Sequence, residues 1–117
     1  MARVLLGLLA VAALVACGGG GGGATGQTAD GHRLYGSNCA LCHGQGGVGK
    51  PALGKDLRNN EFLAGMTDDQ VVEFLKEGRR ADHPLNEKGV DMPPKGGNPG
   101  LSDDDLRQIV AYLRSLS

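Results

Sequence analysis

The clearest pattern of apolar positions lies at the end of the chain. Four apolar residues recur at i, i+3, i+4 and i+7, the spacing that places side chains on one face of a helix. These residues are Leu106, Ile109, Val110 and Leu113. Ser102 precedes three aspartates, which are residues that stabilise the first turn of a helix. The pattern predicts an amphipathic helix that begins after Ser102, with Tyr112 at the edge of its apolar face.

A second helix is predicted over Asp68–Glu77. Thr67 and Gln70 have the spacing of a capping box, in which each side chain accepts a hydrogen bond from a main-chain N–H at the start of the helix. Gly78 follows the last residue, and glycine commonly ends helices because it enters the left-handed backbone region without a steric penalty.

An earlier helix is expected to begin at Asp30, whose carboxylate can cap it, and to continue to about Asn38. It would present Leu34 and Tyr35 to the interior, and a short helical turn is expected over residues 60–64.

Two loops separate these helices. Residues 44–54 contain five glycines, and residues 79–101 are rich in proline and glycine. No segment of useful length alternates between apolar and polar residues as a half-buried strand would. The sequence therefore predicts an all-α fold with three to four helices.

The first residues of the chain have a different composition. Arg3 is followed by apolar or small residues throughout Val4–Ala16, the pattern of a secretory signal peptide. As a helix this run would rise only about 20 Å, whereas a bilayer core is about 30 Å thick. Residues 14–17, Leu-Val-Ala-Cys, resemble a bacterial lipobox, whose cysteine is acylated. We interpret residues 1–16 as a lipoprotein signal peptide and Cys17 as the lipidation site. The alternative is a lone cysteine at the end of an apolar helix.

Residues 17–28 are interpreted as the acylated cysteine and a glycine-rich tether, because six consecutive glycines follow Cys17. The remaining residues, 29–117, form the predicted domain. A formal net charge of −1 gives no indication of nucleic-acid binding. The chain has only four aromatic residues, so a domain of this size would gain stability from a large apolar prosthetic group.

Cys39 and Cys42, with His43, form the sequence Cys-x-x-Cys-His, the attachment signature of c-type haem. Two thiols at this spacing can add to the two vinyl groups of one porphyrin, and the histidine that follows can bind the iron. Two alternatives are a thioredoxin-like dithiol, which needs a βαβ setting, and a zinc site, which needs further ligands at short spacing.

The iron would need either a second protein ligand or an open face, and four residues are candidates for that ligand. Met66 is explained as the apolar residue before a helix cap, and His32 lies on the helix that leads to His43. His83 lies in the long loop and would give a bis-histidine haem. Met92 precedes two prolines, which stiffen the loop where its side chain would project. Met92 is therefore the preferred ligand.

These motifs resemble class I cytochrome c over about residues 28–117. The resemblance rests on the Cys-Ala-Leu-Cys-His motif, the Asp-Met-Pro-Pro segment that contains Met92, and the terminal helix. It implies a class I fold wrapped around one covalently attached haem c, with His43 and Met92 as the iron ligands. It also implies that the Pro51 carbonyl accepts a hydrogen bond from His43 and that Leu53 lines the haem pocket.

The resemblance further implies that the first and last helices cross, with Gly31 permitting close approach and Tyr35 near Tyr112. The sequence thus predicts a non-enzymatic one-electron carrier, lipid-anchored on the extracytoplasmic face of a bacterial membrane. Its expected partners are a quinol-oxidising complex as donor and a terminal oxidase or reductase as acceptor. Alternatives are a fixed haem subunit of a membrane redox complex, and a haem enzyme or gas-binding haem protein.

Overall fold

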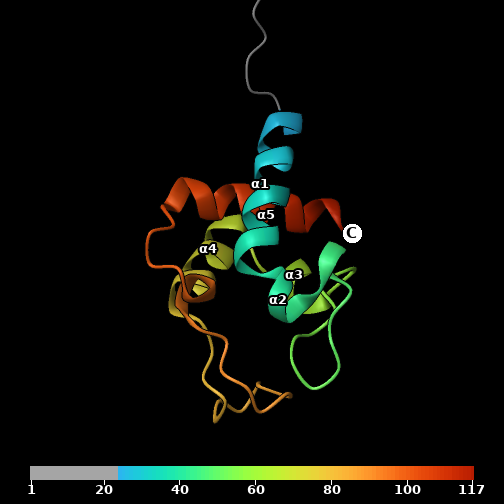
Figure 1. Ribbon diagram of the computed structural model, residues 1–117, viewed down its shortest axis with the longest axis vertical. Helices are drawn as coiled ribbons and strands as arrows, with labels where there is room; N and C mark the ends of the chain where they lie inside the picture. Colours follow the sequence, from blue (N-terminus) through green and yellow to red (C-terminus); the bar gives the residue numbers. More distant parts are fainter. Residues whose placement is uncertain (1–23) are drawn as a thin grey trace, which may run out of the picture.

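The computed structural model describes residues 24–117, and these residues form an all-α fold (Figure 1). They contain five α-helices: α1 (Ala24–Asn38), α2 (Ala40–His43), α3 (Glu61–Ala64), α4 (Asp68–Glu77) and α5 (Asp103–Ser115). Two short 3₁₀ turns cover Gln45–Gly47 and Pro94–Gly97. The predicted fold class is confirmed. The predicted signal peptide and Cys17 lie outside the described residues.

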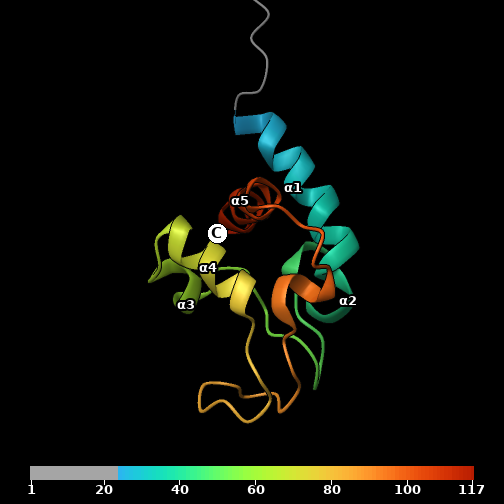
Figure 2. The same cartoon turned by 90° about the vertical axis from the view of Figure 1, so that its left-hand side faces the viewer.

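Helices α1 and α5 cross at the centre of the fold (Figures 1 and 2). Gly31 makes the crossing possible, because a Cβ at this position would overlap the main-chain carbonyl of Gln108. Tyr35 is fully buried, and the centroid of its ring lies 5.1 Å from that of Tyr112. The predicted crossing of the first and last helices is confirmed.

The start of the first helix was predicted wrongly. Helix α1 begins at Ala24 rather than after Asp30, so the described part of the predicted tether, residues 24–28, is helical. The packing of Leu34 and Tyr35 on α5 holds part of the helix in place, so the helix needs no new nucleation. Each residue added at its N-terminal side then gains a main-chain hydrogen bond for the loss of one residue's conformational freedom. Asp30 lies within this helix and does not cap it. Its carboxylate forms an ion pair with the Arg33 guanidinium, one turn further on, at 4.0 Å.

The capping box predicted at Thr67 and Gln70 is present, and a second one begins α5. The Thr67 hydroxyl accepts a hydrogen bond from the Gln70 N–H, while the Gln70 side chain accepts one from the Thr67 N–H. Ser102 and Asp105 form the same reciprocal pair at the start of α5. The apolar faces that follow are buried together and form the core; they include Val71, Val72, Leu75, Leu106, Ile109 and Val110.

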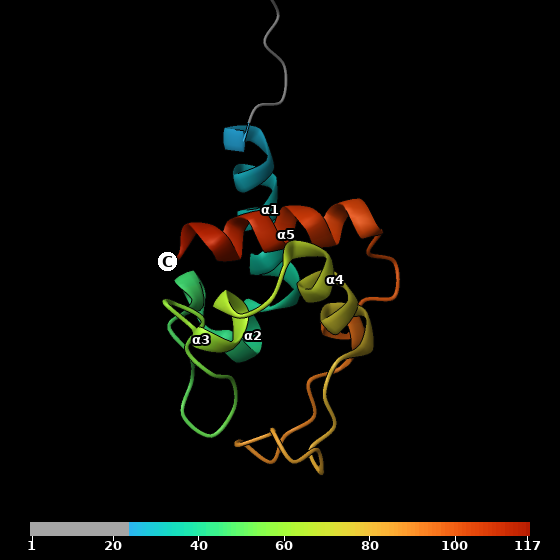
Figure 3. The ribbon, with the colours of Figure 1, turned by 180° about the vertical axis from the view of Figure 1, so that it is seen from behind.

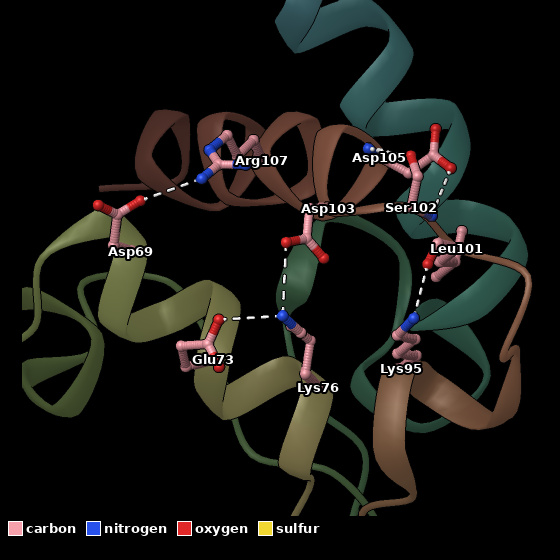
Figure 4. Close-up of polar contacts among 9 residues, drawn as sticks. All are labelled: Asp69, Glu73, Lys76, Lys95, Leu101, Ser102, Asp103, Asp105 and Arg107. Carbon is pink, nitrogen blue, oxygen red and sulfur yellow. Dashed lines mark hydrogen bonds and ion pairs between the residues drawn. The ribbon is translucent and has the colours of Figure 1, made fainter.

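Ion pairs connect the outer faces of α4 and α5 (Figure 4). The Lys76 ammonium lies 3.1 Å from a Glu73 carboxylate oxygen and 3.4 Å from one of Asp103. Arg107 and Asp69 form a further pair at 3.4 Å. The carboxylates and Arg107 are exposed and Lys76 is partly exposed, so each pair contributes little to stability.

Two long loops extend from the helices on the same side of α5 (Figures 1 and 3). Residues 44–60 leave α2, and residues 78–93 leave α4. Together with the helices they line a cavity. Within residues 24–117, none of the helices has the length and apolar character needed to cross a membrane.

Candidate haem site

A cavity of about 290 Å³ lies between the helices and the two loops. Its lining is mostly apolar and includes Leu57, Leu75, Leu101, Leu106, Ile109 and Leu113. The side chains of the Cys-x-x-Cys-His motif, Cys39, Cys42 and His43, also line it, and so does Met92 from a distant part of the sequence. Leu53, which the resemblance to class I cytochrome c implies as a pocket residue, lines the same cavity. The fold therefore brings five of the predicted site residues around one apolar space.

Cys39 and Cys42 are half-buried free thiols at the start and within the short helix α2. The N–H groups of Cys42 and His43 both donate to the Cys39 carbonyl, at 3.2 and 2.9 Å. Burial, with a smaller contribution from Cys42, raises the pKa of the Cys39 thiol to about 11. A catalytic dithiol needs a lowered pKa, so this environment argues against the thioredoxin-like alternative.

The imidazole of His43 is oriented by a main-chain carbonyl. Its Nδ1 lies 2.9 Å from the carbonyl oxygen of Lys55. Because a carbonyl only accepts hydrogen bonds, Nδ1 carries the proton in this contact, and Nε2 keeps a free lone pair. An imidazole held in this way can bind a metal through Nε2.

The prediction that the Pro51 carbonyl would make this contact was wrong. Pro51 is exposed and is not among the residues that line the cavity. The reason lies at Gly54, which packs so closely on the Cys42 main chain that a Cβ there would overlap the Cys42 carbonyl. This approach brings the next residue, Lys55, beneath the imidazole.

Of the four candidates for the second iron ligand, Met92 is the one that lines the cavity. His32 is exposed, with its ring centroid 5.2 Å from that of Tyr112. His83 is also exposed, and its Nδ1 accepts a hydrogen bond from the Leu85 N–H at 3.1 Å. Met66 packs against the helical core. The tertiary structure thus separates Met92 from the three alternatives.

The main chain of Met92 is paired with that of Arg79. The Arg79 N–H donates to the Met92 carbonyl at 2.8 Å, and the Met92 N–H donates to the Arg79 carbonyl at 2.7 Å. On the other side of the prolines, the Lys95 ammonium donates to the Leu101 carbonyl at 2.9 Å (Figure 4). Arg79, Lys95 and the Lys55 carbonyl were not predicted. A main-chain carbonyl or an isolated pair of segments leaves no periodic signal in a sequence.

The same loop also contacts the end of α1. Gly96 lies against the Asn38 main chain, and the Asn98 side-chain amide donates to the Asn38 side-chain oxygen at 3.0 Å. Asn38 directly precedes Cys39. The segment that carries Met92 and the segment that carries the two thiols are therefore held in contact.

These side chains fit a covalently attached haem. Two free thiols at the correct spacing, an imidazole with a free Nε2 and a thioether surround an apolar cavity. By contrast, no three His, Cys, Asp or Glu side chains in the described residues converge into a cluster that could hold a metal ion. The zinc alternative has no support in this part of the chain.

Comparison with known proteins gave consistent results. Residues 26–113 match the family described as cytochrome C oxidase, cbb3-type, subunit III. The chain is 35% identical over 89 residues to the cbb3-type cytochrome c oxidase subunit FixP of Bradyrhizobium diazoefficiens, covering 76% of this chain and 30% of that protein. It is 33% identical over 87 residues to subunit CcoP of Rubrivivax gelatinosus, covering 74% of this chain and 25% of that subunit.

A similar match involves a protein of nearly the same length. Cytochrome c-555 of Prosthecochloris aestuarii is 35% identical over 89 residues, which cover 73% of this chain and 83% of that cytochrome. The chain thus spans less than a third of the FixP and CcoP relatives but most of cytochrome c-555. No solved structure matches the chain. This chain belongs to the family of c-type cytochromes that includes subunit III of cbb3-type cytochrome c oxidase, and its cofactor is covalently bound haem c.

Proposed function

We propose that this protein is a membrane-tethered one-electron carrier whose haem is attached through Cys39 and Cys42 and bound axially by His43 and Met92. The observation that carries the proposal is that these four side chains line one apolar cavity, although Met92 is separated from His43 by almost fifty residues. Haem c, when bound, supplies an iron that accepts and releases one electron.

The roles of the protein side chains follow from their contacts. The Lys55 carbonyl holds the His43 imidazole in one tautomer with Nε2 directed away from that bond. A methionine ligand favours the reduced iron more than a second imidazole does, which raises the reduction potential. Held by both His43 and Met92, the haem would offer no open position to oxygen or peroxide, which would suit electron transfer rather than catalysis.

The membrane attachment is part of the same proposal. Acylation of Cys17 after removal of residues 1–16 would keep the domain on the extracytoplasmic face of a bacterial membrane. There the carrier would meet a quinol-oxidising complex as donor and a terminal oxidase or reductase as acceptor. The similarity to FixP and CcoP, which are oxidase subunits, supports an oxidase as the acceptor.

A second candidate function is a fixed haem subunit of a membrane redox complex. The same FixP and CcoP relatives favour it, whereas the length of cytochrome c-555 favours a separate carrier. Purification from membranes in mild detergent distinguishes the two. A stoichiometric complex with a larger oxidase would support the fixed subunit, and a haem protein that migrates alone would support the carrier.

The iron ligands are tested by spectroscopy of the full chain matured with haem. We expect the oxidised protein to show the weak sulfur-to-iron charge-transfer band, and the reduced protein to bind no carbon monoxide at neutral pH. Met92→Ala should lose the band and bind carbon monoxide, whereas the control Met66→Ala should keep the band and lose only stability. Carbon monoxide binding by the unmodified protein would instead indicate an open iron and a haem enzyme or gas-binding protein.

A further inference from the structure

We propose that Arg79 is a positioning residue for Met92: its guanidinium, held over the rings of Phe62 and Phe74, anchors the main-chain pair that fixes the methionine loop. The inference rests on the proposed role of Met92 as an iron ligand. It adds a residue that neither a motif nor the helical pattern singles out.

The main chains of Arg79 and Met92 are directly paired. Arg79 and Met92 exchange both of their main-chain hydrogen bonds, at 2.8 and 2.7 Å. The pair is isolated, since the described residues contain no named strand around it. Gly78 allows the close approach, because a Cβ there would overlap the Met92 carbonyl. The position of the Met92 backbone is thus coupled directly to that of Arg79.

The side chain of Arg79 lies over two aromatic rings. Its guanidinium carbon lies 4.7 Å from the centroid of the Phe62 ring and 4.9 Å from that of the Phe74 ring. The two rings meet edge to face, with centroids 5.2 Å apart. A cation over an aromatic face is attracted by the ring quadrupole, and a planar guanidinium does this well. Arg79 is therefore attached to α3 through Phe62 and to α4 through Phe74.

Other contacts of this guanidinium are weak. It donates to the Leu85 carbonyl at 3.4 Å, and no carboxylate lies within ion-pair distance of it among the described residues. The rings are consequently its main partners. They are the means by which two helices restrain the loop that carries Met92.

Without the Arg79 guanidinium, we expect the Met92 thioether to leave the iron more often. A thioether is a weak ligand, so its occupancy depends on how strongly the loop is held in place. Removing the guanidinium frees one end of the loop and makes the axial position easier for a competing ligand to enter. Exogenous imidazole added to the oxidised protein is a direct probe, because it must displace the methionine to bind.

Arg79→Ala is compared with Arg80→Ala in the full, haem-loaded chain. Arg80 is the adjacent arginine, but its side chain is 84% exposed, pairs with Asp82 at 3.1 Å and does not line the cavity. We expect Arg79→Ala to bind imidazole about three- to thirtyfold more tightly, the range that corresponds to one or two cation–π contacts. Arg80→Ala should differ from the unmodified protein by less than about twofold.

A second comparison separates positioning from a general effect on the cavity. In a Met92→Ala background no methionine has to be displaced, so adding Arg79→Ala should change imidazole affinity by less than about twofold. An equal effect in both backgrounds would overturn the proposal, as would equal affinities of Arg79→Ala and Arg80→Ala. If the unmodified protein lacks the charge-transfer band, the proposed ligation by Met92 fails instead.

If Arg79→Ala does not incorporate haem, Arg79→Lys replaces it in the imidazole-binding experiment. Lysine keeps the charge but loses the planar group that covers both rings. We expect it to bind imidazole at least about twofold more tightly than the unmodified protein. An affinity equal to that of the unmodified protein would show that the guanidinium is not required and would overturn the inference.

Discussion

The hydroxyl of Tyr35 donates a 2.7 Å hydrogen bond to the carbonyl oxygen of Gly44. Tyr35 lies on α1, and Gly44 directly follows His43 at the end of α2. Both residues are buried, so water cannot replace this bond. The contact connects the crossing of α1 and α5 to the turn that follows the proposed iron ligand.

We expect Tyr35→Phe to lower the free energy of unfolding by about 1–2 kcal/mol at pH 7, because the buried Gly44 carbonyl loses its shorter hydrogen bond and keeps only the one from the Gly47 N–H at 3.2 Å. Burial raises the pKa of Tyr35 well above its usual value of 10.0. Below pH 10 both the folded and the unfolded protein keep this proton, so the full difference remains. Above pH 10 only the unfolded tyrosine loses it, which destabilises the unmodified protein by about 1.4 kcal/mol per pH unit. Urea unfolding at pH 7 and pH 11 should show the difference shrinking, and a constant difference would contradict this account.

Gly31→Ala should destabilise the protein by about 1–3 kcal/mol, because its methyl group would overlap the Gln108 carbonyl where α1 crosses α5. Gly36→Ala is the matched control on the same helix, since a Cβ there meets no atom within 4 Å. It should stabilise the helix by about 0.5–1 kcal/mol. Thermal unfolding followed by circular dichroism measures both changes. A loss of stability in both variants would show that the crossing is not what requires Gly31.

Of two residues in the loop that follows His43, we expect only Gly54 to be sensitive to substitution. Gly54→Ala places a methyl group against the Cys42 carbonyl, so it should displace the Lys55 carbonyl from the His43 imidazole. We expect a lower yield of haem-loaded protein and a shifted reduction potential. Pro51→Ala, at an exposed position, should leave both unchanged. Potentiometric titration measures the reduction potential of both variants. A shifted potential in Pro51→Ala alone would support the hydrogen bond from His43 to the Pro51 carbonyl instead.

Arg114 should be the most important surface arginine for stability. Its guanidinium donates to the carbonyls of Leu63 and Met66, both at 2.6 Å, and to Asp68 at 2.9 Å. Arg114→Ala should therefore cost about 1.5–3 kcal/mol in denaturant unfolding. Arg107→Ala, which removes a single exposed pair, should cost less than about 1 kcal/mol. Equal losses in the two variants would argue against an anchoring role for Arg114.

Substitution of Cys17 tests the proposed membrane attachment. The unmodified chain should fractionate with membranes and be extracted by detergent, whereas Cys17→Ser should not be acylated. Gly18→Ala keeps the cysteine and is the control for a change in the same segment. Mass spectrometry of the mature N-terminus identifies the acyl groups directly. An unmodified Cys17 in membrane-derived protein would exclude the lipoprotein interpretation.

Much of this fold could be predicted because its signals are local. The capping box that begins α4 depends on residues three positions apart, and the apolar face of α5 is visible in one stretch of sequence. The Cys-x-x-Cys-His motif is equally local, since its chemistry depends only on neighbouring residues. The packing of the first helix on the last was inferred from the order of helices and loops, the family resemblance added their crossing, and the structure confirms both.

What the sequence could not decide depends on contacts between distant segments. The start of α1 at Ala24 follows from packing on α5, and the carbonyl that orients His43 comes from Lys55 because Gly54 packs on the Cys42 main chain. Sequence alone determined which side chains have the chemistry to hold a haem, because that chemistry belongs to residue types and their short spacing. Only the tertiary structure decided that Met92, rather than His83 or Met66, lines the cavity, because that choice depends on how two loops close over the helices.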